Sequence, residues 1–210
     1  MQDPYKILTP SLFWWFVRYI DWFCWHFDVY RNPPLQQPGQ SVPDTSIWPH
    51  CFATWKSHNH HGLACYYKNN FKCTTKKLQS FTCLEVLSTL VLEKSQEFSF
   101  VLIYISPSYT FGQILCELKV LLALLETTKR TIICGDFNVD ACTSTKNYLQ
   151  LKSVMDNYGF TNVNLIRSHK LGSCLDHIYL SNDLRNSFYH CVPYPTYYSD
   201  HYSVLLQLQR

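Results

Sequence analysis

The sequence predicts an α/β fold, because strand-like and helix-like patterns alternate from residue 62 to the end of the chain. Short runs rich in β-branched and aromatic residues are typical of buried strands. Between them lie two stretches whose apolar residues recur at steps of three and four, which indicates amphipathic helices. With 210 residues, the chain is long enough to bury one substantial core, so a single main domain is expected.

The first expected strands lie at residues 62–68 (GLACYYK) and 98–105 (FSFVLIYI). A helix is expected over residues 111–129, with a core-facing stripe of Ile114, Leu115, Leu118, Leu121, Leu122 and Leu125. Lys129 and Arg130 suit the end of this helix, because cations there complement its dipole. The stripe also suits a partner helix, but covering the domain's own sheet is the favoured interpretation.

The second half of the chain continues the alternation. A strand at residues 131–134 (TIIC) leads into GDFN, and a second helix is expected over residues 146–158, before Gly159. The remaining expected strands lie at residues 161–166, 175–180 and 202–209.

The first 60 residues differ in composition from the rest. All six tryptophans and seven of the ten prolines lie there. Proline lacks a backbone donor and restricts the residue before it, so we expect an aberrant, poorly ordered segment over residues 1–60 and the domain over residues 61–210. Residues 11–27 are aromatic and apolar, but Arg18 and Asp21 interrupt them and argue against a membrane span.

Charge and cysteine content narrow the function classes. A formal charge of +3 permits contact with a polyanion, but it is far below the clustered basicity that by itself indicates a nucleic-acid binder. The ten cysteines include no CxxC pair, and no signal peptide is evident. Free thiols are therefore expected in an intracellular, not a secreted, protein, with the nucleus as one candidate compartment.

Three short polar clusters lie at the ends of expected strands, where function is commonly carried. They are GDFN at residues 135–138, LDH at 175–177 and SDH at 199–201. Carboxylates, an amide and an imidazole brought together suit a hard cation and the hydrolysis of a phosphodiester. Each cluster alone is a weak signal, since DxN turns are often only local caps of the backbone.

In motif type, order and spacing the chain resembles the endonuclease/exonuclease/phosphatase family. The resemblance rests on IYISPSY, the leucine-rich helix, ICGDFNVD, LDHIYLS and YYSDHYSVLLQL, and it covers residues 60–210. HHGLACYYKNN and DHIYLS are most similar to the endonuclease domains of retroelements, namely non-LTR retrotransposons and Helitron-like elements. The resemblance implies a four-layer sandwich of two facing mixed β-sheets flanked by helices, incomplete here at the N-terminus.

The resemblance also implies roles for individual residues. Asp136 would orient or activate the nucleophile, and Asn138 would position it together with the phosphate. His201 would contact the scissile phosphate, and Asp176 would pair with His201.

Further implied roles concern the metal and the substrate. Asp200 would lie at the metal end, with Mg²⁺ as the cofactor and Mn²⁺ as an alternative, and DNA would be the partner. Tyr104, in LIYISPS, matches the tyrosine that reaches the phosphate in the family. The alternative for Tyr104 is a core aromatic of its strand.

The sequence departs from the family in its first half, which supplies an asparagine and a glutamate, the latter the principal magnesium ligand. No glutamate precedes Glu85. Ala53, Thr54 and Trp55 resemble Glu-Thr-Trp superficially, but they lie too close to Gly62 for the usual spacing. Without this carboxylate, magnesium is expected to bind weakly. The alternatives are therefore an active metal-dependent DNA endonuclease, a catalytically dead remnant that binds nucleic acid or protein, and a small-substrate phosphatase.

Other polar groups have simpler explanations. Histidines and cysteines between residues 51 and 73 offer zinc ligands, but their spacing matches no common finger. His177, next to Asp176, should face the opposite side of its strand and is expected to pack there. A basic stretch suits a DNA backbone and a solvated sheet edge equally, and it consists of Lys68, Lys72, Lys76 and Lys77.

Overall fold

The computed structural model describes residues 51–58, 61–68, 72–76, 78–93, 96–125, 130–185, 188–194 and 199–209. The strands of the first half are β1 (Cys51–His58), β2 (His61–Lys68), β3 (Lys72–Lys76), β4 (Leu84–Glu93) and β5 (Gln96–Ile105). The second half holds α2 (Phe111–Leu124), β6 (Arg130–Asp136), α3 (Lys146–Asn157), β7 (Phe160–Asn162), β8 (Asp176–Ser181), β9 (Phe188–Tyr194) and β10 (Ser203–Gln209). This mixed architecture confirms the predicted α/β class.

The central element is a six-stranded mixed sheet of order β3-β4-β5-β6-β8-β7. Only β5 and β6 run parallel in it, and α2 makes the crossover between them, as a parallel pair requires. Two further antiparallel pairs, β1 with β2 and β9 with β10, form separate two-stranded sheets.

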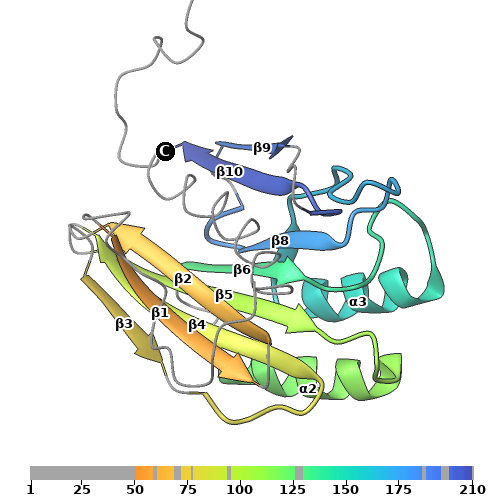
Figure 1. The fold of residues 1–210 in the computed structure, drawn as a ribbon, viewed down its shortest axis with the longest axis horizontal. Coiled ribbons are helices and arrows are strands. Elements are labelled where there is room, and N and C mark those ends of the chain that lie inside the picture. Colours follow the sequence, from red (N-terminus) through yellow and green to blue (C-terminus); the bar gives the residue numbers. More distant parts are fainter. Residues whose placement is uncertain are drawn as a thin grey trace, which may run out of the picture.

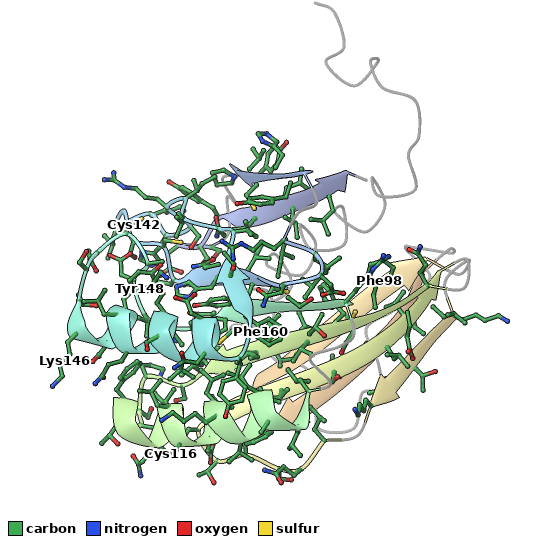
Figure 2. The ribbon with its side chains drawn as sticks, turned by 180° about the vertical axis from the view of Figure 1, so that it is seen from behind. Phe98, Cys116, Cys142, Lys146, Tyr148 and Phe160 are labelled. Atoms are coloured by element: carbon green, nitrogen blue, oxygen red, sulfur yellow. The ribbon has the colours of Figure 1, made fainter. Side chains whose placement is uncertain are left out.

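Two apolar clusters hold these elements in layers. Along β5, Val101, Ile103 and Ile105 face α2 and α3, whereas Phe100 and Leu102 face the opposite side, where β2 and β10 pack. The helices thus cover one face of the central sheet and the two-stranded sheets cover the other (Figure 1). Seen from behind, α2 and α3 lie side by side over the sheet (Figure 2).

Helix α2 begins where the sequence predicts. The Thr110 side chain accepts from the Gln113 backbone, and the Gln113 side chain accepts from Thr110, which forms a reciprocal cap. Its stripe covers the domain's own sheet, as expected, with Ile114, Leu118, Leu121 and Leu122 buried. The helix ends at Leu124, before the expected residue 129, because Leu125 already has extended backbone angles.

Arg130 therefore does not end the helix. It is the first residue of β6 and donates to the Gln96 side chain at 2.5 Å. Its guanidinium also lies 5.6 Å from the centre of the Phe98 ring. Lys129 falls outside the described residues.

The expected strand at residues 161–166 is only partly present, since β7 ends at Asn162. The Asn162 side chain accepts from the Asn164 N–H at 3.0 Å, and the Asn164 side chain accepts from the Ile166 N–H at 3.2 Å. These two local bonds turn the backbone and compete with strand pairing. Strands β1, β3, β4 and β9 were not predicted.

Only part of the N-terminal segment, residues 51–58, can be compared with the expectations for residues 1–60. Residues 1–50, including the apolar stretch at 11–27, lie outside the described residues. Strand β1 pairs along its whole length with β2, across the boundary expected at residue 60. In the part of the chain that the structure describes, no helix is long and apolar enough to cross a membrane.

Candidate active site

Strand register brings polar residues of four neighbouring strands, β4, β5, β6 and β8, into one row. The row crosses the central sheet at one end of these strands. Glu85 pairs with Tyr104, Tyr104 with Asp136, and Asp136 with Asp176. The parallel row two positions away is apolar and buried between the sheets, and it consists of Leu87, Leu102, Cys134 and Ile178. Because side chains two apart share a face, the polar row borders the space between the layers.

His201 joins this row from the opposite layer, just before β10. Its Nδ1 lies 2.9 Å from Asp176 Oδ2, and both side chains are largely buried, 12% and 10% exposed. The pairing expected between Asp176 and His201 is therefore present. With Nδ1 committed to Asp176, any contact of this ring with a substrate falls to Nε2.

Asp136 and Asn138 form a tight turn at the end of β6. Asp136 Oδ1 accepts from the Asn138 N–H at 2.9 Å, and Asn138 Nδ2 donates to the Ile105 carbonyl at 2.7 Å. Asn138 adopts a positive φ of 50°, which asparagine tolerates better than most residues. The turn caps the backbone locally and also places a carboxylate and an amide together, so both sequence interpretations apply to it.

Gly135 is required by the close approach of β5. A Cβ at this position would lie 1.8 Å from the Ile103 carbonyl oxygen, and the φ of Gly135 is +143°. Only glycine fits there without moving one of the two strands. The residue therefore sets the backbone that carries Asp136.

The loop between β7 and β8 holds Asp176 by its backbone. Ser168 Oγ accepts from the N–H groups of Leu175 and Asp176 at 3.1 and 3.0 Å. The Asn164 side chain, fully buried, donates to the Asp176 carbonyl. These bonds fix where β8 begins and so fix the side chain that pairs with His201.

Asp200 is the exposed acid of the site, with 58% of its side chain accessible. His169 Nε2 lies 3.2 Å from Asp200 Oδ2. Partial burial acts to raise the pKa of the Asp200 carboxyl, but the His169 hydrogen bond and the electrostatic effect of the neighbouring His201 outweigh it, so the pKa lies below its ordinary value. Asp200 is thus held in its charged form.

One group of potential metal ligands occurs in the described residues. Donor atoms of His169, Asp200 and His201 lie within 4.8 Å of one another. Only Asp200 offers the oxygen that a hard cation prefers. The donor set fits a cation held by one carboxylate plus waters and substrate oxygens, and it falls short of a closed protein cage. The histidine and cysteine side chains of the alternative zinc group lie mostly outside the described residues.

His177 points away from this row, as its position in the strand predicts. It is fully buried, stacks on Phe137 with ring centres 4.9 Å apart, and donates from Nε2 to the Val139 carbonyl at 2.7 Å. Burial lowers the pKa of His177 to about 4, which keeps the ring neutral. Its place is structural, in the core beneath α3.

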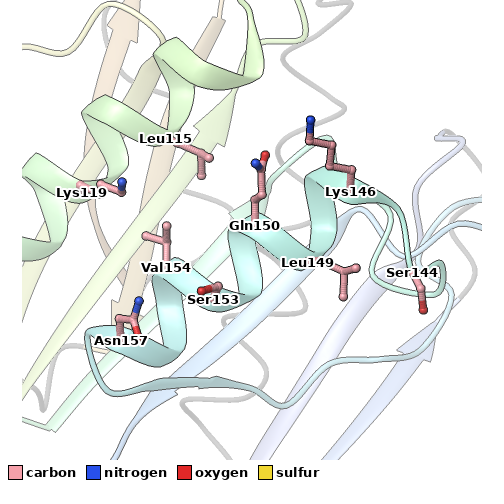
Figure 3. Close-up of a pocket in the computed structure, with 9 residues that line it drawn as sticks. All are labelled: Leu115, Lys119, Ser144, Lys146, Leu149, Gln150, Ser153, Val154 and Asn157. Atoms are coloured by element: carbon pink, nitrogen blue, oxygen red, sulfur yellow. The ribbon is translucent and has the colours of Figure 1, made fainter.

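A groove of about 670 Å³ opens between α2 and α3, on the other side of the sheet (Figure 3). Its lining mixes apolar side chains such as Leu115 and Leu149 with the cations Lys119 and Lys146. None of the expected site residues lines it. The described lysines of the basic stretch, Lys72 and Lys76, lie exposed on the edge strand β3.

Sequence reasoning missed several residues of the site. His169 and Ser168 stand in a polar loop with no pattern that separates them from an ordinary turn. In the sequence, Glu85 stands out only as the first glutamate of the chain. Their positions follow from strand register and from a loop that returns to the site, which are contacts between distant segments.

Comparisons with known proteins agree on one fold. A model described as Endonuclease/Exonuclease/phosphatase family matches residues 25–201. The endonuclease domain of TRAS1, a telomere-specific non-LTR retrotransposon, has a TM-score of 0.66 at 13% identity, over 80% of this chain and 82% of that one. The human Nocturnin catalytic domain with bound sulfate has a TM-score of 0.59 at 15% identity, over 87% of this chain and 77% of that one.

A third solved structure, D. rerio TDP2 complexed with a single-strand DNA product, gives a TM-score of 0.54 at 11% identity, over 77% of this chain and 78% of that one. A sequence search of the curated proteins finds no match. At these identities the solved structures show a shared fold.

Proposed function

This chain belongs to the endonuclease/exonuclease/phosphatase family, and on that premise we propose that it is a metal-dependent phosphodiester hydrolase acting on DNA, of the mobile-element endonuclease type. The observation that carries the proposal is the 2.9 Å pair of Asp176 and His201 beside Asp136 in one row. Acids and an imidazole in such an arrangement suit attack of water on a phosphodiester.

In the proposed reaction Asp136 orients a water molecule and takes its proton, and Asn138 helps to position that water and the phosphate. The water oxygen forms a bond to phosphorus, and the bond from phosphorus to one ester oxygen breaks. The leaving oxygen takes a proton from solvent and Asp136 returns its proton to solvent, so the products are a phosphomonoester and an alcohol. Asp176 holds the His201 ring so that Nε2 contacts the phosphate, as Tyr104 does from β5.

A divalent cation, when bound, would stabilise the negative charge that develops on the phosphoryl oxygens. Asp200 would hold it, with Mg²⁺ as the first candidate and Mn²⁺ as the alternative. Glu85 adds a carboxylate to the same row, on the other side of Tyr104 from Asp136.

A catalytically silent remnant that binds nucleic acid or protein is the second candidate. The observation that favours it is the lack of any glutamate before Glu85, since the family's principal magnesium ligand is a glutamate in that half. Weak cation binding would leave the transition-state charge without its main partner.

Nicking of supercoiled plasmid in Mg²⁺ separates these candidates. We expect wild-type protein and the Asp156→Asn control, an exposed aspartate on α3, to convert the plasmid to open circles at similar rates. The Asp136→Asn variant should be slower by about 100-fold or more.

Equal nicking by wild type and Asp136→Asn would contradict the enzyme proposal, because a contaminant would then explain the activity. Salt-sensitive retention of DNA without nicking would support the remnant. Release of phosphate from small monoesters, with no effect on plasmid, would indicate a phosphatase instead.

A further inference from the structure

A short antiparallel bridge ties the loop before β8 to the segment before β10. His169 and His201 are bridge partners. The Lys170 N–H donates to the Asp200 carbonyl at 2.8 Å, and the Tyr202 N–H donates to the Ser168 carbonyl at 2.6 Å. The His169 ring therefore lies beside the site, edge-on to the His201 ring with centres 4.9 Å apart.

The hydrogen bonds of His169 fix which of its nitrogens carries the proton. The Leu171 N–H points at Nδ1 from 3.1 Å, and a backbone N–H can only donate. Nδ1 must therefore accept, so in this ring the proton is on Nε2. Nε2 then donates to Asp200 Oδ2, 3.2 Å away.

This arrangement conflicts with a role for His169 as a metal ligand. A ligating nitrogen must present its lone pair, and here the Nδ1 lone pair takes the Leu171 N–H while Nε2 carries a proton. Binding a metal through Nε2 would move the proton to Nδ1, directly against the Leu171 N–H. His169 is thus hydrogen-bonded to Asp200 and only in ring contact with His201, so these three residues do not form a three-ligand metal site.

We propose that His169 is a positioning residue of the active site, which holds the Asp200 carboxylate through Oδ2 and leaves its other oxygen to face a cation. This inference rests on the proposed function, in which Asp200 lies at the metal end. The His169 side chain is only 11% exposed, so its ring is confined by the loop and confines Asp200 in turn. Partners of this kind orient a ligand and are worth about 10- to 100-fold in metal affinity or activity.

The first test needs no catalysis. In wild-type protein with ¹⁵N-labelled histidine, long-range proton–nitrogen spectra at neutral pH assign the protonated nitrogen of each ring. We expect the His169 proton on Nε2, and we expect it to stay there when Mg²⁺ or Zn²⁺ is added. A proton on Nδ1, or loss of the Nε2 signal on addition of Zn²⁺, would overturn the inference.

The second test uses conservative rescue. His169→Gln retains an N–H donor near the position of Nε2, whereas His169→Leu keeps bulk without a donor. We expect His169→Leu to lower kcat/KM for plasmid nicking about 10- to 100-fold and to raise the Mg²⁺ concentration for half activity. His169→Gln should recover to within about threefold, and His190→Leu, at an exposed position on β9, should match wild type.

Wild-type activity in His169→Leu would overturn the positioning role. Failure of His169→Gln to recover would do the same, because the donor would then not be what matters. If wild-type protein cleaves nothing, the proposed function fails, and the histidine spectrum alone still supports or overturns the inference.

Discussion

Asp176 and His201 are joined by a 2.9 Å hydrogen bond although they lie 25 positions apart in the chain. Asp176 begins β8 of the central sheet, and His201 precedes β10 of the facing layer. The pair therefore links the central sheet to the facing layer, and it forms only when both layers are correctly packed.

Breaking this pair should slow nicking, and the effects of the two single substitutions should not add in the double variant. We expect Asp176→Asn and His201→Asn each to lower kcat by about 100-fold, since the ring loses its orientation or is absent. The double variant should be little slower than either single variant, because residues that act as a unit share their effect. Losses that multiply in the double variant would show that the two residues act independently.

Gly135→Ala should damage both stability and activity. Its Cβ would lie 1.8 Å from the Ile103 carbonyl oxygen, so β5 or β6 must shift at a cost of about 2–3 kcal/mol. Gly112→Ala is the matched control, because nothing lies within 4 Å of its Cβ; it should be neutral or slightly stabilising. Urea unfolding of both variants measures the difference, and equal stabilities would contradict the close packing of the two strands.

Glu85→Gln tests whether the row extends beyond Tyr104. Glu85 pairs with Tyr104 at the end of the sheet that carries Asp136. Loss of the Glu85 charge should weaken the binding of a cation nearby. We expect about a tenfold fall in activity at limiting Mg²⁺. Glu97→Gln, which removes a carboxylate at the other end of β5, should leave the Mg²⁺ dependence unchanged. The same Mg²⁺ dependence in Glu85→Gln and wild type would exclude Glu85 from the cation's surroundings.

Because of His177, the free energy of unfolding should decrease as the pH falls. Its pKa is about 4 in the folded protein, against 6.5 for an ordinary histidine, so the unfolded chain binds the extra proton first. The stabilisation is complete above pH 6.5 and is lost as pH falls towards 4, by about 3 kcal/mol. The free energy of unfolding measured at several pH values should decline less steeply in His177→Phe than in wild type or in His190→Gln. Identical slopes would show that His177 is not buried as a neutral ring.

The helices were predictable because their signals are local. Apolar residues at steps of three and four mark α2, and Thr110 with Gln113 forms the cap that begins it. Strand β4 escaped prediction because Ser88 and Thr89 interrupt its apolar run, although both are buried in the sheet. Its pairing with β5 determines the strand more than its own residues do.

The site was only partly predictable for a similar reason. Order and spacing of short motifs pointed to Asp136, Asp176 and His201, whose strands the sequence also indicated. His169 and Glu85 carry no such motif, because one reaches the site through a bridge between loops and the other through strand register. Both depend on pairing between distant segments, which local periodicity does not encode.

A crystal structure of the Asp136→Asn variant with a short DNA duplex and Mg²⁺ tests the shared site most directly. We predict one phosphate within hydrogen-bonding distance of both His201 Nε2 and the Asn138 side chain, with the cation beside Asp200. A duplex bound only along the Lys72 and Lys76 edge of β3, with no phosphate at His201, would contradict the account.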